Sequence, residues 1–167
     1  MIDNKKINKR SVATFYLDDD FYGIDLGYVQ EFIEVLPYNE IPGNELPIIG
    51  MANLRGQIVT IFDLKFKLYK KVSETHKRYV VIRNKRSIKK VESDISLKST
   101  SREPIALSVT KRGKILELNP AVFKSAPPQD NAEESEFIES VVELDDNLLK
   151  ILNLQYVIGR ADDEDED

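Results

Sequence analysis

The sequence predicts an all-β protein, arranged as barrels or as a sandwich. Eight to ten short runs have the length and apolar pattern of strands, turn residues separate them at short intervals, and little of the chain has a helical period. Short strands at this spacing are typical of barrels and sandwiches. With 167 residues, 41% of them hydrophobic, the chain can form one domain or two small subdomains with a buried core.

The first part of the chain predicts a hairpin, a helical turn and two more strands. Two apolar runs flank three consecutive aspartates, which predicts a hairpin over residues 12–25. Asp25 is predicted to cap a short helical turn at Leu26–Tyr28. Strands are predicted over 29–36 and 57–64, separated by a loop rich in proline and glycine, and residues 65–69 form either a helical turn or the end of a strand.

The second part predicts further strands and a short C-terminal helix. Residues 70–77 are polar and mark a subdomain junction, and the basic, serine-rich stretch 84–103 is predicted to be an exposed loop. The other expected elements are strands at 78–82, 105–109 and 114–118, a turn at 111–113, a loop at 125–135, a hairpin of 137–144 with 148–152, a helix over about 154–161 capped by Asn153, and a disordered acidic tail at 162–167.

Composition excludes several classes of protein. The chain has no cysteine, which excludes disulfides, thiol catalysis and thiolate metal sites, and agrees with a reducing, cytoplasmic location. No stretch approaches the roughly 18 apolar residues of a membrane helix, and no apolar segment follows the basic N-terminus as in a secretory signal.

The charges are unevenly distributed along the chain. Residues 65–114 carry 16 Lys or Arg and 4 Asp or Glu, whereas residues 115–167 carry 3 and 15. The basic segment suggests a nucleic-acid-binding β-barrel as an alternative function. That alternative needs aromatic residues for base stacking, and the segment offers only Tyr69 and Tyr79, the latter in an expected core strand. The acidic segment would also repel phosphates.

The residue types of most catalytic sites are not combined here in a recognisable pattern. The one histidine, His76, lies in a polar linker and is predicted to be exposed, with no serine placed to form a triad. Asp18–Asp20 lack the spacing of a known calcium loop, and Gly50 and Gly56 match no phosphate-binding motif. Paired carboxylates of a small hydrolase remain a second alternative. The sequence therefore favours a binding module that is not an enzyme and has no cofactor or metal.

Residues 21–64 carry a family resemblance. The stretches FYGIDLGYVQEFIEVLPYNEIPG and IIGMANLRGQIVTIFDL combine an aromatic–Gly–apolar strand, Val-x-Glu, a proline-bearing loop, Asn-Leu-Arg-Gly, an apolar strand and Asp-Leu. In order and spacing this pattern resembles the CheW family of chemotaxis coupling proteins, and after residue 77 the resemblance holds only in outline. Departures from the family include Thr60 for a common proline, the long basic loop 84–103, and Val-Thr-Lys at 109–111.

The resemblance implies a fold and two partners. It implies a single domain over 1–161, built of two SH3-like five-stranded β-barrels side by side, over about 12–70 and about 77–152, closed by a helix at about 153–161. It also implies a non-enzymatic cytoplasmic adaptor that couples the cytoplasmic tip of methyl-accepting chemoreceptors to the regulatory domain of the histidine kinase CheA. It implies contact with the membrane only through those receptors, and no nucleic-acid partner.

By the same resemblance, two sets of residues are expected to dock the partners. The receptor is expected in a groove between the barrels, which needs small or apolar residues to admit a helix; the matching positions are Val29, Gly50, Met51, Ala52, Asn53 and Leu54. The kinase is expected on the first barrel, at Ile41, Pro42, Ile58, Val59 and Phe62. Val29 and several of the kinase positions could equally be core.

Arg55 and Glu31 form a further expected pair. Gly56 permits a backbone turn closed to residues with a Cβ, and the strand behind it anchors the turn. Arg55 is then held at the barrel mouth, where its guanidinium can bind a carboxylate in a bidentate pair. The resemblance points to Glu31, in the matching Val-x-Glu stretch, as the predicted partner. The alternative is that Arg55 is a surface residue in an ordinary turn.

Overall fold

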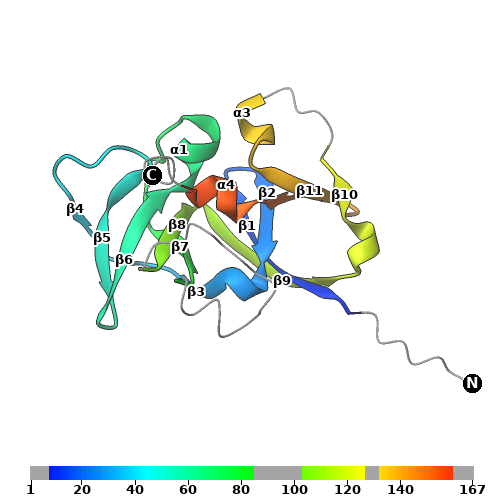
Figure 1. Ribbon diagram of the computed structural model, residues 1–167, viewed down its shortest axis with the longest axis horizontal. Helices are drawn as coiled ribbons and strands as arrows, with labels where there is room; N and C mark the ends of the chain where they lie inside the picture. Colours follow the sequence, from blue (N-terminus) through cyan, green and yellow to red (C-terminus); the bar gives the residue numbers. More distant parts are fainter. Residues whose placement is uncertain (1–7, 85–102, 127–131, 160–167) are drawn as a thin grey trace, which may run out of the picture.

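A computed structural model describes residues 8–84, 103–126 and 132–159 (Figure 1). The described residues form two six-stranded sheets and a few short helices, which confirms the all-β class. The helical elements are η1 Leu26–Tyr28, α1 Leu64–Tyr69, η2 Pro120–Val122, α3 Ala132–Ser135 and α4 Leu154–Ile158. None of the described helices is both long enough and apolar enough to cross a lipid bilayer.

The strands of the two ends of the chain form one sheet, here called the terminal sheet. Its order is β10-β11-β12-β2-β1-β9, and β12 runs parallel to β2. Its strands are β1 Arg10–Leu17, β2 Asp20–Asp25, β9 Lys111–Leu118, β10 Lys124–Ser125, β11 Ile138–Glu143 and β12 Leu148–Leu152.

The strands in between form the middle sheet, in the order β3-β7-β8-β6-β5-β4. Here β6 runs parallel to β8, and every other pairing is antiparallel. The strands are β3 Val29–Ile33, β4 Asn39–Glu40, β5 Ile48–Leu54, β6 Gln57–Asp63, β7 Arg78–Ile82 and β8 Ile105–Val109.

This arrangement differs from the expected one in strand number and in the path of the chain. Each sheet has six strands rather than five, and the pairings among the described residues leave both sheets open at their edges. The first hairpin pairs with β9 and β12 from the second half of the chain, whereas β7 and β8 join β3–β6. The expected boundaries, about 12–70 and 77–152, therefore do not coincide with the division of strands between the sheets.

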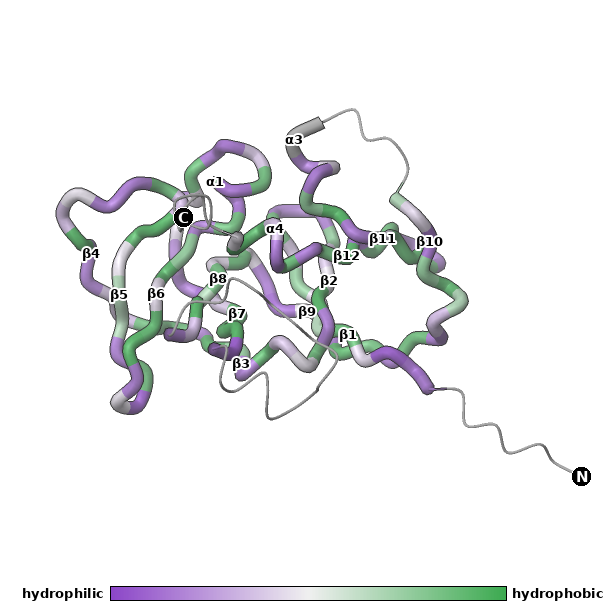
Figure 2. The backbone as a smooth tube through the Cα atoms, viewed as in Figure 1, coloured by the Kyte–Doolittle hydropathy of each residue, from purple (hydrophilic) through white to green (hydrophobic). Residues whose placement is uncertain are grey.

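Three clusters of buried side chains hold the fold together. One cluster draws Phe15 and Tyr22 from the terminal sheet and Phe62 and Leu107 from the middle sheet, so it joins the two sheets. The second cluster comes from the middle sheet and Leu36, and the third from the terminal sheet alone. Figure 2 shows β6 as hydrophobic along most of its length, as expected for a strand that supplies two of the clusters.

Most predicted elements are present, and the differences have local causes. The two hairpins, the strands at 57–64 and 78–82, and the helical turn at 65–69 are confirmed. The strand predicted for 29–36 ends at Ile33, and Val35 has φ +74°, which strand geometry does not allow. Asp25 does not cap the helical turn through its side chain; its carboxylate binds Arg10 instead, with Nη2–Oδ2 at 3.0 Å.

The turn predicted at 111–113 is wrong. These residues belong to β9, which pairs with β1 across a register shift between Ala13 and Phe15. At Gly113 the two strands lie so close that a Cβ would overlap the Thr14 hydroxyl, so glycine here serves close packing within a strand. Since β8 and β9 belong to different sheets, Thr110 is a crossover and not part of a hairpin.

The C-terminal region also differs in detail. The loop predicted at 125–135 includes the last residue of β10 and all of α3, and α4 ends at Ile158. The predicted cap of α4 is confirmed, because Asn153 Oδ1 accepts hydrogen bonds from the backbone N–H groups of Gln155 and Tyr156. Most of the loop 84–103 and the acidic tail 162–167 lie outside the described residues.

Candidate docking surface

The Asn-Leu-Arg-Gly motif forms the tight turn between β5 and β6. Arg55 and Gly56 are the two loop residues, and both have positive φ, 51° and 82°, as in the turns that suit a twisted two-residue hairpin. Asn53 supports the turn, because its Oδ1 accepts a hydrogen bond of 2.8 Å from the Gly56 N–H. The motif therefore fixes the direction of the Arg55 side chain from a rigid hairpin.

Arg55 and Glu31 form the predicted bidentate pair. Arg55 Nη1 donates to Glu31 Oε1 at 2.7 Å, and Nη2 donates to Oε2. The hydrogen bond from Arg55 is the main reason why the pKa of Glu31 lies below its ordinary value. The pair links β3, at the edge of the middle sheet, to the tip of the β5–β6 hairpin, while the Arg55 side chain remains 70% exposed.

We expect this pair to contribute little to stability. Exposed ion pairs gain little because water screens the charges and ordering two long side chains costs entropy. An Arg55→Ala variant should therefore keep a thermal unfolding midpoint close to that of the unmodified chain, measured by circular dichroism, and Glu31→Gln should behave alike. A large drop in the midpoint would show that the pair holds β3 in place.

The residues predicted for receptor docking divide between two faces of β5. Gly50, Ala52 and Leu54 are buried, whereas Met51 and Asn53 are exposed, as the alternation of a strand requires. At Gly50 a Cβ would overlap the backbone oxygen of Asn39, so the missing side chain makes room for β4. Val29 lies in the cluster between the sheets with 5% exposure. The structure does not bring these six residues to one accessible groove.

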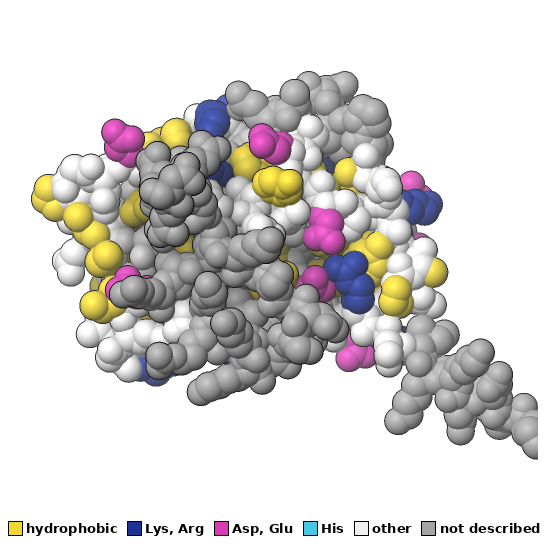
Figure 3. Space-filling model, viewed as in Figure 1, with side chains coloured by type: hydrophobic (Ala, Val, Ile, Leu, Met, Phe, Trp, Pro, Cys, Tyr) yellow, Lys and Arg dark blue, Asp and Glu magenta, His cyan; other side chains and the backbone are white. Residues whose placement is uncertain are grey.

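The residues predicted for kinase docking also include both buried and exposed side chains. Val59 and Phe62 are buried, Ile41 is half-buried, Pro42 is exposed, and Ile58 is 50% exposed. Ile58 pairs with Asn53 and Met51 pairs with Thr60, so all four side chains point out from one surface, here called the β5–β6 face. Figure 3 shows hydrophobic side chains along the margin of the molecule near β4 and β5.

A broad open groove of about 880 Å³ was missed by sequence reasoning. Its apolar part comes from the terminal sheet and includes Tyr16 and Phe21, whose rings stack with centroids 4.7 Å apart. Arg78, Lys111, Arg112 and Lys114 make it basic, and Glu34 and Arg78 belong to the middle-sheet half of the fold. We call it the basic groove. It could not be predicted, because it depends on the placement of β9 beside β1 and near β7.

His76 is a structural residue, and its predicted exposure is wrong. Its side chain is 13% exposed; Nε2 lies 2.9 Å from Asp63 Oδ2, and Nδ1 lies 3.3 Å from the Tyr38 hydroxyl. Ser73 Oγ donates to Asp63 Oδ1 and not to the histidine, so the three residues do not form a serine–histidine relay. Sequence reasoning missed the role because Asp63 is thirteen residues away.

Other observations weigh against the two alternative functions. In the described part of the chain, no group of three or more His, Cys, Asp or Glu residues could hold a metal ion. The pKa values of Glu31 and Asp63 are lowered, whereas a catalytic acid usually has a raised one. Tyr79 is buried and Tyr69 is half-buried with its hydroxyl hydrogen-bonded to Tyr22 and Asp20, so neither ring is free to stack on a base.

Comparisons with known proteins give a consistent result. The chain is 20% identical over 162 residues to a probable chemotaxis protein CheW of Rhizobium etli, covering 96% of both proteins. It is 26% identical over 98 residues to a chemotaxis protein CheW of Helicobacter pylori, covering 54% of this chain and 59% of that one. In structure it matches the scaffolding protein TtCheW of Thermoanaerobacter tengcongensis, with a TM-score of 0.72, 19% identity, and coverage of 96% and 95%.

The protein-family comparison covers nearly the whole described fold. The model described as a CheW-like domain matches residues 11–162, which include every strand from β2 to β12 and all but the first residue of β1. The resemblance seen in residues 21–64 thus extends over both sheets. The chain belongs to the CheW-like domain family.

Proposed function

We propose that the protein holds a CheA-type histidine kinase and the tips of chemoreceptors together in one signalling complex. As a member of the CheW family it is a chemotaxis scaffold, or adaptor, and not an enzyme. The family match over residues 11–162 is the observation that carries the proposal. Such partners lie in the cytoplasm, so the protein acts there and reaches the membrane only through receptors.

The β5–β6 face supports kinase docking. Met51 and Ile58 present apolar surface, 38% and 50% exposed, on a strand pair held rigid by a tight turn. Rigid apolar side chains surrounded by polar residues are typical of the centre of a protein–protein interface. Of the residues predicted for the kinase, Ile41, Pro42 and Ile58 are accessible, and they lie in or next to this hairpin.

The basic groove supports receptor docking. It combines an apolar floor with a positive rim and draws residues from both halves of the fold, as a site between the two halves should. Of the residues predicted for the receptor, Met51 and Asn53 lie instead on the β5–β6 face. The groove therefore replaces the buried positions Val29, Gly50, Ala52 and Leu54 as the proposed receptor surface.

Calorimetric titration with the regulatory domain of CheA from the same organism tests the kinase surface. Ile58→Asp should weaken binding about tenfold or more, because it places a charge in the desolvated centre of the contact. Val122→Asp, an equally drastic change at a 40% exposed residue of the terminal-sheet half, is the matched control and should bind normally. Equal affinities for both variants would exclude the β5–β6 face.

Co-sedimentation with receptor-bearing membrane vesicles tests the receptor surface separately. Lys114→Glu reverses an exposed charge in the basic groove and should lower the bound fraction several-fold, because rim charges steer and select partners. Lys124→Glu alters an exposed lysine outside the groove lining and should have no effect. Normal sedimentation of Lys114→Glu together with loss by Ile58→Asp would assign the receptor to the other face.

A further inference from the structure

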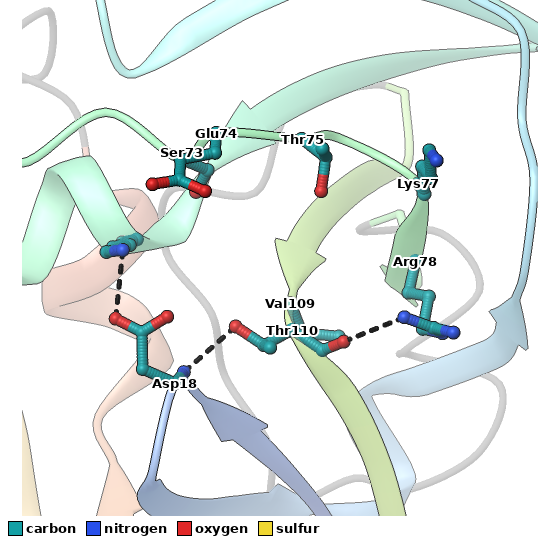
Figure 4. Close-up of a pocket in the computed structure, with 9 residues that line it drawn as sticks. Asp18, Ser73, Glu74, Thr75, Lys77, Arg78, Val109 and Thr110 are labelled. Carbon is teal, nitrogen blue, oxygen red and sulfur yellow. Dashed lines mark hydrogen bonds and ion pairs between the residues drawn. The ribbon is translucent and has the colours of Figure 1, made fainter.

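A second pocket, of about 370 Å³, lies where the two sheets meet and shares Arg78 and Thr110 with the basic groove (Figure 4). Its walls come from three places: Asp18 in the β1–β2 turn, Lys65 on α1 with the loop 73–77 after it, and Arg78 and Thr110 at the ends of β7 and β8. A volume of this size lies at the lower end of the range for small-molecule sites.

The pocket contains several hydrogen-bond donors that have no acceptor among the residues that line it. Thr110 Oγ1 accepts a hydrogen bond of 2.9 Å from the Asp18 N–H, which leaves the hydroxyl proton of Thr110 free to donate. Arg78 uses one of its five N–H groups to donate a hydrogen bond of 3.2 Å to the Thr110 carbonyl oxygen. Figure 4 shows the Thr75 hydroxyl directed toward the interior, and no described residue pairs with it.

The charges around the pocket favour an anion. The lining contains Lys65, Lys77 and Arg78 against Asp18 and Glu74. Asp18 is already paired with Lys65, with Oδ2–Nζ at 2.9 Å, and a lysine ammonium in such a pair keeps two further N–H donors. Lys77 makes no ion pair with any described residue, and Arg78 has no carboxylate partner among them.

We propose that this pocket binds a small oxyanion, the phosphoryl or carboxylate group of a small molecule. Arg78, Lys77 and Lys65 supply the charge, and the hydroxyls of Thr75 and Thr110 supply oriented donors. The bound anion contacts the β1–β2 turn of the terminal sheet and β7 of the middle sheet at the same time, so it fastens the two sheets to each other. This ligand role goes beyond the adaptor function and does not depend on it.

Titration of the full chain with inorganic phosphate, followed by amide chemical shifts, tests the proposal. Saturable shifts should centre on Asp18, Thr75 and Thr110. The double variant Lys77→Gln/Arg78→Gln should weaken binding about tenfold or more, since the charge-assisted hydrogen bonds of both side chains to the anion are lost. Thr75→Val should weaken it less, and Lys124→Gln, an exposed lysine outside the pocket, should leave it unchanged.

Acetate is titrated in parallel to distinguish the two ligand chemistries. Tighter binding of phosphate would identify a phosphoryl group as the ligand, and tighter binding of acetate would identify a carboxylate group. Shifts that do not saturate, that spread over exposed lysines including Lys124, or that persist in the double variant would mean an adventitious ion only and would overturn the proposal. A thermal unfolding midpoint near that of the unmodified chain shows that each variant is folded.

Discussion

Replacing Asp63 with alanine is expected to lower the free energy of unfolding by about 3–5 kcal/mol, because four hydrogen bonds to a buried carboxylate are lost. The Asp63 side chain is fully buried at the end of β6. Its oxygens accept from the N–H of Phe66 at 3.1 Å, the N–H and hydroxyl of Ser73 at 2.9 and 2.8 Å, and His76 Nε2 at 2.9 Å. One carboxylate thus caps α1 and anchors the loop after it.

Urea unfolding of Asp63→Ala, Asp63→Asn and Asp145→Ala measures this contribution. Asparagine keeps the shape but turns an amide N–H₂ toward hydrogen-bond donors, so Asp63→Asn should lose nearly as much stability as Asp63→Ala. Asp145→Ala removes an exposed aspartate in a turn and should change stability by no more than about 0.5 kcal/mol. A loss of less than about 1 kcal/mol for both Asp63 variants would contradict the anchoring role.

The same residue should make stability depend on pH. Burial by itself raises the pKa of Asp63, but hydrogen bonds from His76, Ser73 and Phe66 outweigh it, and the pKa lies below its ordinary value. Because the pKa of Asp63 is lower in the folded than in the unfolded state, its ionised carboxylate contributes its full stabilisation at pH values above the ordinary pKa of aspartate, about 3.9. The contribution disappears as pH falls through the folded-state value. The stability difference between the unmodified chain and Asp63→Asn should therefore shrink below about pH 4.

Replacing Lys150 with methionine is expected to cost about 3–5 kcal/mol, because it leaves a buried carboxylate without its counter-charge. Lys150 Nζ donates to Glu134 Oε1 at 2.7 Å, and the two side chains are only 14% and 8% exposed. Tyr22 donates to the same oxygen at 2.6 Å and also contacts the Tyr69 hydroxyl. Burial is the main reason, and the hydrogen bond to Glu134 the second, why the pKa of Tyr22 is raised, so the Tyr22 hydroxyl stays protonated and remains a hydrogen-bond donor.

A double-mutant cycle checks this expectation. Lys150→Met/Glu134→Gln should recover most of the loss, because the glutamine is neutral and can still accept from Tyr22. Lys124→Met breaks an exposed pair with Glu143, 3.5 Å apart and over 60% exposed on both sides, and should cost less than about 1 kcal/mol. Equal losses in Lys150→Met and the double variant would show that packing of the lysine stem, and not charge, is responsible.

Local structure was predictable because its signals lie within a few residues of one another. The aspartates of the first turn, the Arg-Gly pair of the β5–β6 turn and the Asn153 cap each specify their element through a short-range hydrogen bond or a positive φ. The partition of strands between the sheets was not predictable in this way. It depends on pairings such as β12 with β2, whose partners are over a hundred residues apart.

The candidate site was predictable only where a pair of complementary groups marked it. Arg55 was identified because a guanidinium on a fixed turn can bind a carboxylate, and Glu31 because it lies in the Val-x-Glu stretch of the family resemblance; the pair is present. The predicted docking sets were not separated by side-chain direction, because strand alternation buries Gly50, Ala52 and Leu54 and exposes Met51 and Asn53. Sequence shows that a position is apolar, whereas the direction of its side chain depends on which face the partner strand covers.

The interleaving of the sheets also has a consequence for synthesis of the chain. Residues 10–25 leave the ribosome before the other strands of this fold, but one edge of β2 stays unpaired until β12, at residues 148–152, has been synthesised. The middle sheet has all of its strands by residue 109. The nascent protein should therefore complete the middle sheet first, while the β1–β2 hairpin keeps one unpaired edge, open to aggregation and to chaperones, until residues 148–152 have been synthesised.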